Sequence, residues 1–267
     1  MKGGFHPFHL VSPSPWPLLL SVSTFSLMVG FYVWMSSMGS VLMVLGVFSV
    51  MLSLFCWLRD VIRESTYQGC HTMRVMKGLR LGIVMFIISE VMFFFSIFFG
   101  VFFLSLNPDV VLGSSYPPVG IQPLNYMGVP FLNTMILLSS GVTVTWCHHG
   151  IMSGNKHHSV LGLTITVVLG VLFVMFQFEE YYESSYTIAD SVCGSLFYMS
   201  TGFHGIHVML GTVMLIVSLV RLTMNHFSSI HNLGFEMSAW YWHFVSVVWL
   251  CFSLSIYWWG SWDIILM

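Results

Sequence analysis

The chain has 267 residues, of which 57% are hydrophobic and only 7% are charged, and its mean hydropathy is +0.86. Soluble domains carry about 25% charged residues, so this composition excludes a soluble protein and indicates a polytopic membrane protein. The formal net charge of −2 does not indicate a basic surface for nucleic acid, and we expect no nucleic-acid partner. The five cysteines are scattered without a Cys-x-x-Cys pair, which argues against a disulfide framework and a zinc site.

Seven apolar runs are long enough to cross a bilayer as helices, which takes about 20 residues. They cover residues 16–35, 41–58, 79–104, 130–149, 161–178, 191–222 and 235–259. A charged loop at 59–78 and a loop at 107–128 rich in Pro, Gly and Tyr separate three of them. We therefore predict an all-α membrane protein with seven transmembrane helices, forming a single polytopic membrane domain over residues 1–267.

The charges of the connecting segments sort by side of the membrane. Seven spans place the termini on opposite sides, and all eight Lys and Arg residues then fall on the N-terminal side. The opposite side receives only acidic charges, from Asp109, Glu179, Glu180, Glu183, Asp190 and Asp263. The positive-inside rule therefore predicts that the N-terminus faces the cytoplasm or an organelle matrix.

Glu90 lies near the middle of the third span. A charge at that depth costs about 3 kcal/mol or more, so we expect Glu90 to be protonated or turned toward protein partners. Counted from the basic side at about 1.5 Å per residue, Glu90 and His243 lie about 15 Å deep and His207 about 21 Å deep. We predict that the three side chains form one polar cluster, which would act as structural contact, proton store or metal site. A metal site is the least favoured of these three roles. Metal sites need three or four ligands, and no second carboxylate or cysteine is predicted at this depth.

Two pairs of adjacent histidines, His148-His149 and His157-His158, raise the hypothesis of haem or copper ligation. Adjacent residues on a helix diverge by about 100°, so neither pair chelates one metal well. We expect interfacial histidines that face water and phosphate, with no metal site and no catalytic residue in this chain.

A basic rim is expected where the loop from Arg59 to His71 and the residues Arg221, His226 and His231 share one side of the membrane. This rim would also be explained if its basic residues only set the orientation of the helices in the membrane. The functional alternative is headgroup binding, because basic pockets on the cytoplasmic or matrix side suit anionic phospholipids. Arginine offers a planar fork to phosphate, and histidine adds further donors.

A series of motifs runs in order along nearly the whole chain. It comprises PSPWPL (13–18), RDVIRESTYQG (59–69), KGLRLG (77–82), FIISEVMFF (86–94), PPVGIQPLN (117–125), LLSSGVTVTW (137–146), EYYES (180–184), TGFHGIHV (201–208), AWYWHFV (239–245) and SIYWWGS (255–261). No single motif would suffice, but the series as a whole resembles subunit III of mitochondrial cytochrome c oxidase, in the haem-copper oxidase family.

The resemblance implies that helices one and two splay from a bundle of helices three to seven, with lipid in the cleft. It implies a cofactor-free subunit, with haem and copper in the partner subunits I and II, and further small oxidase subunits beside them. Such a subunit would support electron transfer from cytochrome c to oxygen and the coupled proton pumping. It would do so by stabilising the catalytic subunits, binding lipid and aiding proton uptake or oxygen access. The implied location is the mitochondrial inner membrane, multi-pass, with the N-terminus in the matrix.

Site residues follow from the same resemblance. Glu90 matches the family's mid-membrane carboxylate. The family's lipid-contact positions, for phosphatidylglycerol, phosphatidylethanolamine or cardiolipin, match Arg63, Glu64, His71, Arg221, His226 and His231. The sequence departs from the family at Leu58 and Met224, where a tryptophan and a lysine are frequent. No prediction is made for the C-terminal DIILM.

Two other classes of protein stay open on the residues alone. The first is a seven-helix ion-coupled transporter or receptor with Glu90 as the coupling site. A transporter tends to show broken helices and inverted repeats, and neither is visible in the sequence. A receptor usually carries signalling loops on the inner side, where the loops here are short. The second class is a bis-histidine haem enzyme, which would need facing histidines at matched depth.

Overall fold

The computed structural model describes residues 6–108, 110, 113–118, 120–122 and 124–261, so Asp109, Asp263 and the C-terminal DIILM lie outside the described residues. Seven α-helices follow one another: α1 (Trp16–Met35), α2 (Val41–Thr66), α3 (Met73–Leu106), α4 (Val129–Met152), α5 (Lys156–Glu183), α6 (Ser191–Thr223) and α7 (Leu233–Phe252). A π-helical turn, η2 (Ser253–Trp258), and a 3₁₀ turn, η3 (Trp259–Ser261), continue α7.

All seven helices are long and apolar enough to cross a membrane, which confirms the predicted fold class for the part of the chain that the structure describes. Several helices run past the apolar segments that predicted them. α3 begins at Met73, and α5 extends from Lys156 to Glu183. Polar residues at these ends continue the helix because its backbone hydrogen bonds stay internal. Glu180, expected in an acidic loop, is therefore a helical residue, and that expectation was wrong.

The chain divides into two compact units, residues 1–79 and 80–267. The first unit holds α1, α2 and the first two turns of α3, and the second holds the rest of α3 and α4 to α7. The predicted splay of the first two helices concerns how the units are placed, and it stays a prediction.

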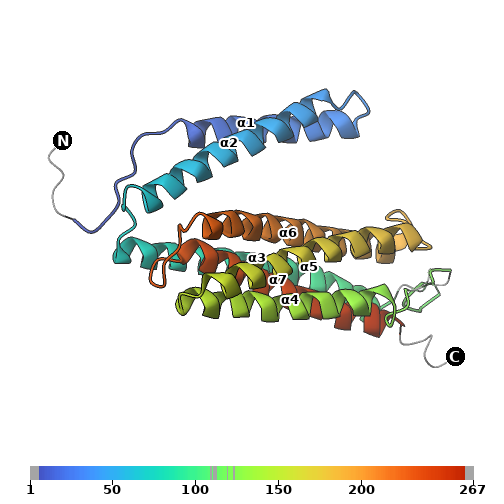
Figure 1. Cartoon of the computed structure of the whole chain (residues 1–267). Helices are drawn as coiled ribbons and strands as arrows, with labels where there is room; N and C mark the ends of the chain where they lie inside the picture. The colour runs from blue at the N-terminus through green and yellow to red at the C-terminus, as the bar shows by residue number, and fades with distance from the viewer. Residues whose placement is uncertain (1–5, 109, 111–112, 119, 123, 262–267) are drawn as a thin grey trace. The chain divides into compact units, whose positions relative to one another are not determined.

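In the first unit, α1 and α2 form an antiparallel hairpin (Figure 1). Two glycines let the helix backbones approach closely. A Cβ atom added to Gly30 would lie 2.6 Å from the backbone nitrogen of Met43, and one added to Gly46 would lie 2.6 Å from the Cα of Leu27. Small residues at such contacts are typical of helix pairs in membranes, where close packing replaces the hydrophobic effect.

In the second unit, α4 to α7 lie side by side (Figure 1), and the aromatic core of the unit lies on α7. The fully buried Trp242 donates its indole N–H to Ser140 Oγ at 2.9 Å, and Trp249 donates to Thr134 Oγ1 at 3.1 Å. Both acceptors are on α4. These bonds satisfy donors that hydrocarbon cannot, so they fix the rotation of α7 against α4.

The third helix packs on α6 and α7 through aromatic rings. Phe93 meets Phe203 with ring centroids 5.2 Å apart, and Phe94 meets Phe252 at 5.9 Å. At the basic end of the second unit, the Arg80 guanidinium contacts the Glu236 carboxylate at 2.9 Å. These contacts set both the depth and the rotation of α3, and they turn Glu90 toward α6.

A tight turn joins α5 to α6 at the acidic end. The Asp190 carboxylate accepts the backbone N–H of Thr187 at 2.7 Å and its hydroxyl at 2.9 Å. Because both donors stabilise the ionised form, they hold the pKa of Asp190 below its usual range. The turn thereby fixes where the last residues of α5 stand against α6.

Candidate functional site

The central feature of the second unit is a hydrogen-bonded pair between α3 and α6. His207 Nε2 lies 2.8 Å from Glu90 Oε2, and His207 Nδ1 lies 2.7 Å from the carbonyl oxygen of Phe203. A carbonyl oxygen only accepts, so Nδ1 must carry a hydrogen. The bond to Glu90 then contains one proton, which resides either on the carboxyl or on Nε2. The two side chains therefore share a single proton, as a neutral acid–imidazole pair or as an ion pair.

Aromatic side chains surround this pair. The ring of Phe94 meets the His207 ring edge-on at 5.0 Å, and Tyr241 stacks on it at 6.3 Å. The Glu90 side chain is 22% exposed and that of His207 is 14% exposed, so the pair borders the surface of this unit. A shared proton in apolar surroundings, close to a surface, suits the storage or passage of protons.

His243 does not join this pair in the described structure. It is exposed on α7 and lines a groove of about 600 Å³ with Gly141, Trp146 and His149 of α4. The residue of α7 that faces His207 is Tyr241. Two positions along a helix turn the side chain by about 200°, so His243 points to nearly the opposite face. The predicted depth placed all three residues together, but the helix rotation separates His243 from the other two.

Three predicted lipid-contact residues lie together in the first unit. Arg63, Glu64 and His71 line a groove of about 760 Å³ that also includes Trp57. The remaining lining comes mostly from the segment before α1, namely Phe8, His9, Val11, Ser12, Pro13, Ser14 and Pro15, with Trp16 of α1 and Asp60, Val61, Gln68, Val75 and Leu79. The groove therefore combines apolar walls with charged side chains at one end.

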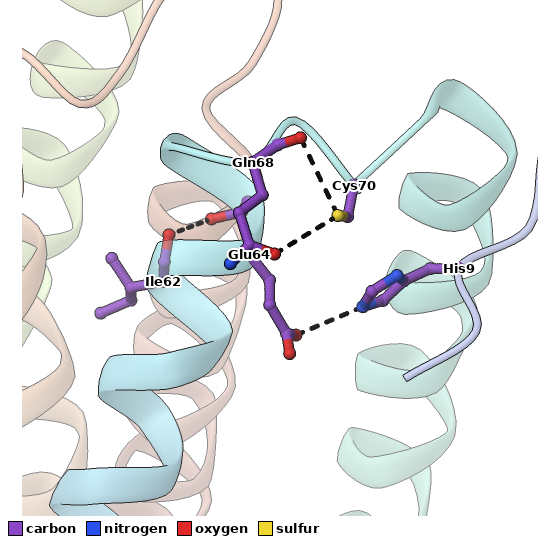
Figure 2. Close-up of polar contacts among 6 residues, drawn as sticks. His9, Ile62, Glu64, Gln68 and Cys70 are labelled. Atoms are coloured by element: carbon purple, nitrogen blue, oxygen red, sulfur yellow. Dashed lines mark hydrogen bonds and ion pairs between the residues drawn. The ribbon is translucent and has the colours of Figure 1, made fainter. Parts of the chain in front are cut away.

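Ion pairs organise the charged end of this groove, which Figure 2 shows in part. His9 Nε2 lies 3.3 Å from Glu64 Oε2, and the His9 and His71 rings are 6.0 Å apart. Arg63 is 3.8 Å from the Asp60 carboxylate, and its side chain is 57% exposed. Asp60 also accepts the indole N–H of Trp16 at 2.7 Å, which ties α1 to α2. The guanidinium of Arg63 is thus held at the groove and is accessible.

The other three predicted lipid contacts surround the C-terminal end of α6. The Arg221 guanidinium lies 4.5 Å above the Phe227 ring, and a Cβ atom on Gly234 would collide with it. The backbone N–H of His226 bonds to the Arg221 carbonyl at 3.0 Å, and that of His231 bonds to Ser228 Oγ at 3.0 Å. A compact loop therefore holds these basic residues at one end of the second unit.

A further buried acid escaped the analysis of the sequence. Glu180 is only 2% exposed, and its Oε1 atom accepts the hydroxyl of Tyr257 at 2.5 Å. The neighbouring Glu179 and Glu183, one turn apart, are both exposed. Three glutamates within five residues had indicated a solvated loop, and only the helical period would have set Glu180 apart from the others.

These features define a class of protein: a polytopic helical membrane protein with a protonatable pair among its spans. Comparison with known proteins then gives the family. The family model for cytochrome c oxidase subunit III matches residues 6–261. Over 256 residues the chain is 53% identical to cytochrome c oxidase subunit 3 of Branchiostoma lanceolatum, and 52% identical to those of Pisaster ochraceus and Ornithorhynchus anatinus. Each match covers 96% of this chain and 98% of the relative.

The chain therefore belongs to the cytochrome c oxidase subunit III family. It is a subunit of the multi-subunit cytochrome c oxidase of the respiratory chain and a multi-pass protein of the inner membrane. This confirms the resemblance inferred from the motifs, and it supports the oxidase subunit over the ion-coupled transporter or receptor.

Proposed function

We propose that this chain is the cofactor-free, non-catalytic subunit of its oxidase, with haem and copper in the partner subunits I and II. It stabilises those subunits and supports proton uptake or oxygen access. The observation that carries the proposal is the Glu90–His207 pair, whose bond at 2.8 Å occupies the imidazole nitrogen that a metal would need. His207 Nδ1 is engaged with the Phe203 carbonyl, so both ring nitrogens serve hydrogen bonds.

The proposed orientation places the N-terminus in the matrix. The basic residues support it, because Arg63 and Arg80 lie near the chain positions where α2 ends and α3 enters its apolar segment, and Arg221 ends α6. In a seven-span topology these positions share one side. Matrix-side arginines also suit anionic headgroups.

The first test separates this subunit from the purified oxidase and measures its absorption spectrum and metal content. We expect no haem bands and no stoichiometric copper, because adjacent histidines on a helix diverge and the Glu90–His207 pair is already satisfied. The remaining complex should keep the full haem content. A Soret band or one copper per separated subunit would contradict the proposal.

We propose that the groove of the first unit holds a phospholipid such as phosphatidylglycerol, phosphatidylethanolamine or cardiolipin. Its apolar walls fit acyl chains, and the exposed Arg63 guanidinium presents a planar fork to phosphate. Glu64 and His71 border the same space and suit a headgroup that carries both charges. A second headgroup position is proposed at Arg221, His226 and His231.

Replacing Arg63 and Arg221 with alanine should release phospholipid from the purified complex. Each cationic side chain contributes about 1 kcal/mol toward an anionic headgroup, so each change should weaken retention about fivefold. Mass spectrometry of the extracted lipid measures the loss. The control is Arg74→Ala, which removes a basic residue of the first turn of α3 that does not line the groove. Equal lipid content in the double variant and the control would mean that both arginines set the membrane orientation only and do not bind lipid.

A further inference from the structure

Glu180 is a buried carboxyl group, distant in sequence from the partly exposed Glu90 and held by different helices. It lies in the last turns of α5, with 2% of its surface exposed. Oε1 accepts the Tyr257 hydroxyl at 2.5 Å. Oε2 is buried and has no hydrogen-bond partner among the described residues. One of its two oxygens is therefore left for something other than the tyrosine.

The tyrosine that reaches Glu180 comes from an unusual piece of backbone. Tyr257 lies in η2, the six-residue π-helical turn that continues α7. π-Helical turns are rare and occur frequently at functional sites, because the wider turn redirects side chains. Tyr257 is 2% exposed and packs against Phe197 and Trp249, with ring centroids 5.8 and 5.7 Å away. This packing holds the Tyr257 hydroxyl in place against the Glu180 carboxyl.

Gln177 adds a third polar group, one helical turn before Glu180. It is 5% exposed, and it lies close enough to act on both the Glu180 carboxyl and the Tyr257 phenol. Neither atom of its amide reaches a described residue with the distance and angles of a full hydrogen bond. Buried polar atoms without partners are rare and cost about 1–3 kcal/mol each. The amide and Glu180 Oε2 together form an incomplete polar site that one bridging donor–acceptor molecule would complete.

In the part of the chain that the structure describes, the groups that act on the Glu180 carboxyl are neutral. Tyr257 approaches from η2, and Gln177 and Tyr181 from its own helix. Tyr181 is in turn bonded to Thr201 of α6 at 2.8 Å. Lys156, the only basic residue of α5 besides histidine, lies 24 positions away, which is about 36 Å along the helix. An ionised Glu180 would be a desolvated charge with no counter-ion among the residues that the structure describes, which is strongly unfavourable.

We propose that Glu180 is a second proton-binding site of this subunit, in which a neutral carboxyl and one internal water complete the hydrogen bonds of Gln177. The ligands are a proton and a water molecule. A small cavity of about 30 Å³, room for one water, is lined by Tyr257, Tyr186 and Tyr116, but not by Glu180 or Gln177, so it adjoins the site only through Tyr257. Tyr116 belongs to the loop between α3 and α4, so the cavity lies between that loop and the tyrosine that donates to Glu180.

Infrared spectra of the purified oxidase at neutral pH test the proposal on three forms: wild type, Glu180→Gln and Glu179→Gln. The last is the matched control, since Glu179 is the exposed neighbour in the same turn. We expect a carboxylic C=O band that shifts in D₂O, is lost in Glu180→Gln and is kept in Glu179→Gln. If Glu180→Gln instead removes only carboxylate bands, Glu180 is ionised and the proposal is wrong.

Two further variants keep the test decisive if Glu180→Gln does not assemble. Tyr257→Phe retains the carboxyl and removes the donor to Oε1, so the C=O band should move to higher frequency. Gln177→Leu removes the amide that the water bridges, so it should also displace the band. A band that stays in place in both variants would overturn the assignment to Glu180.

Discussion

Gly46→Val is expected to disrupt the hairpin of α1 and α2 more than any other single change considered for this chain. A Cβ atom at Gly46 would lie 2.6 Å from the Cα of Leu27, far inside van der Waals contact. The obstacle is backbone, so no rotamer change relieves it. Overpacking costs about 1–3 kcal/mol, and a backbone clash belongs at the upper end. About 3 kcal/mol corresponds to a change of roughly a hundredfold in the packing equilibrium of the hairpin.

The measurement is the fraction of oxidase that retains this subunit and its phospholipid as the temperature is raised in mild detergent. Gly46→Ala should act in the same direction with a smaller effect, because its Cβ alone already collides. Gly82→Ala is the control, since a Cβ at Gly82 of α3 meets nothing within 4 Å. Retention equal to that of the control would show that the helices pack without this close contact.

The number of helices could be predicted from the sequence because hydrocarbon permits few alternatives: every apolar run of about 20 residues must satisfy its own backbone. Helix ends could not be predicted as well. α5 continues to Glu183 because polar residues at an interface cost a helix little, whereas hydropathy falls there. Because the helix continues beyond the apolar run, Glu180 lies in the core and not in the loop where it was expected.

The candidate site shows which part of a helical residue's position can be predicted from the sequence. The depth of the residue can be predicted, whereas its rotation about the helix axis cannot. Depth follows from the rise per residue, and it put Glu90 and His207 within about 6 Å of each other along the membrane normal. The structure closes that difference with a hydrogen bond between the two side chains. Rotation about the helix axis depends on which face packs, and Trp242 and Trp249 set it for α7 through their bonds to α4. A count of residues cannot include those contacts, so Tyr241 occupies the place expected for His243.

The groove in the first unit could be predicted only in part. Family resemblance pointed to Arg63, Glu64 and His71, and the structure brings these three together. Most of the opposite wall comes from the segment before α1, where His9 contacts Glu64 and adjoins His71. That segment has no helical or strand period, so no periodic pattern indicated where its side chains would lie.

His207→Ala is expected to destabilise the second unit by about 2 kcal/mol, because it leaves Glu90 in apolar surroundings without its partner. A double-mutant cycle separates this bond from other losses. Between Glu90→Ala and His207→Ala we expect a coupling energy of about 1–2 kcal/mol, the upper range for polar contacts between transmembrane helices. The readout is the concentration of sodium dodecyl sulfate at which the subunit leaves the purified oxidase.

The matched cycle pairs Glu90→Ala with His243→Ala. His243 faces α4, so its coupling to Glu90 should stay within about 0.5 kcal/mol of zero, as for independent sites. The contrast between the cycles is informative because both histidines were predicted to join Glu90 in one cluster. Equal coupling in both would restore the three-residue cluster, whereas zero coupling in both would mean that the Glu90–His207 bond contributes nothing to stability. If His207 alone couples to Glu90, the bond between these two side chains contributes to stability, and His243 belongs instead with the groove beside α4.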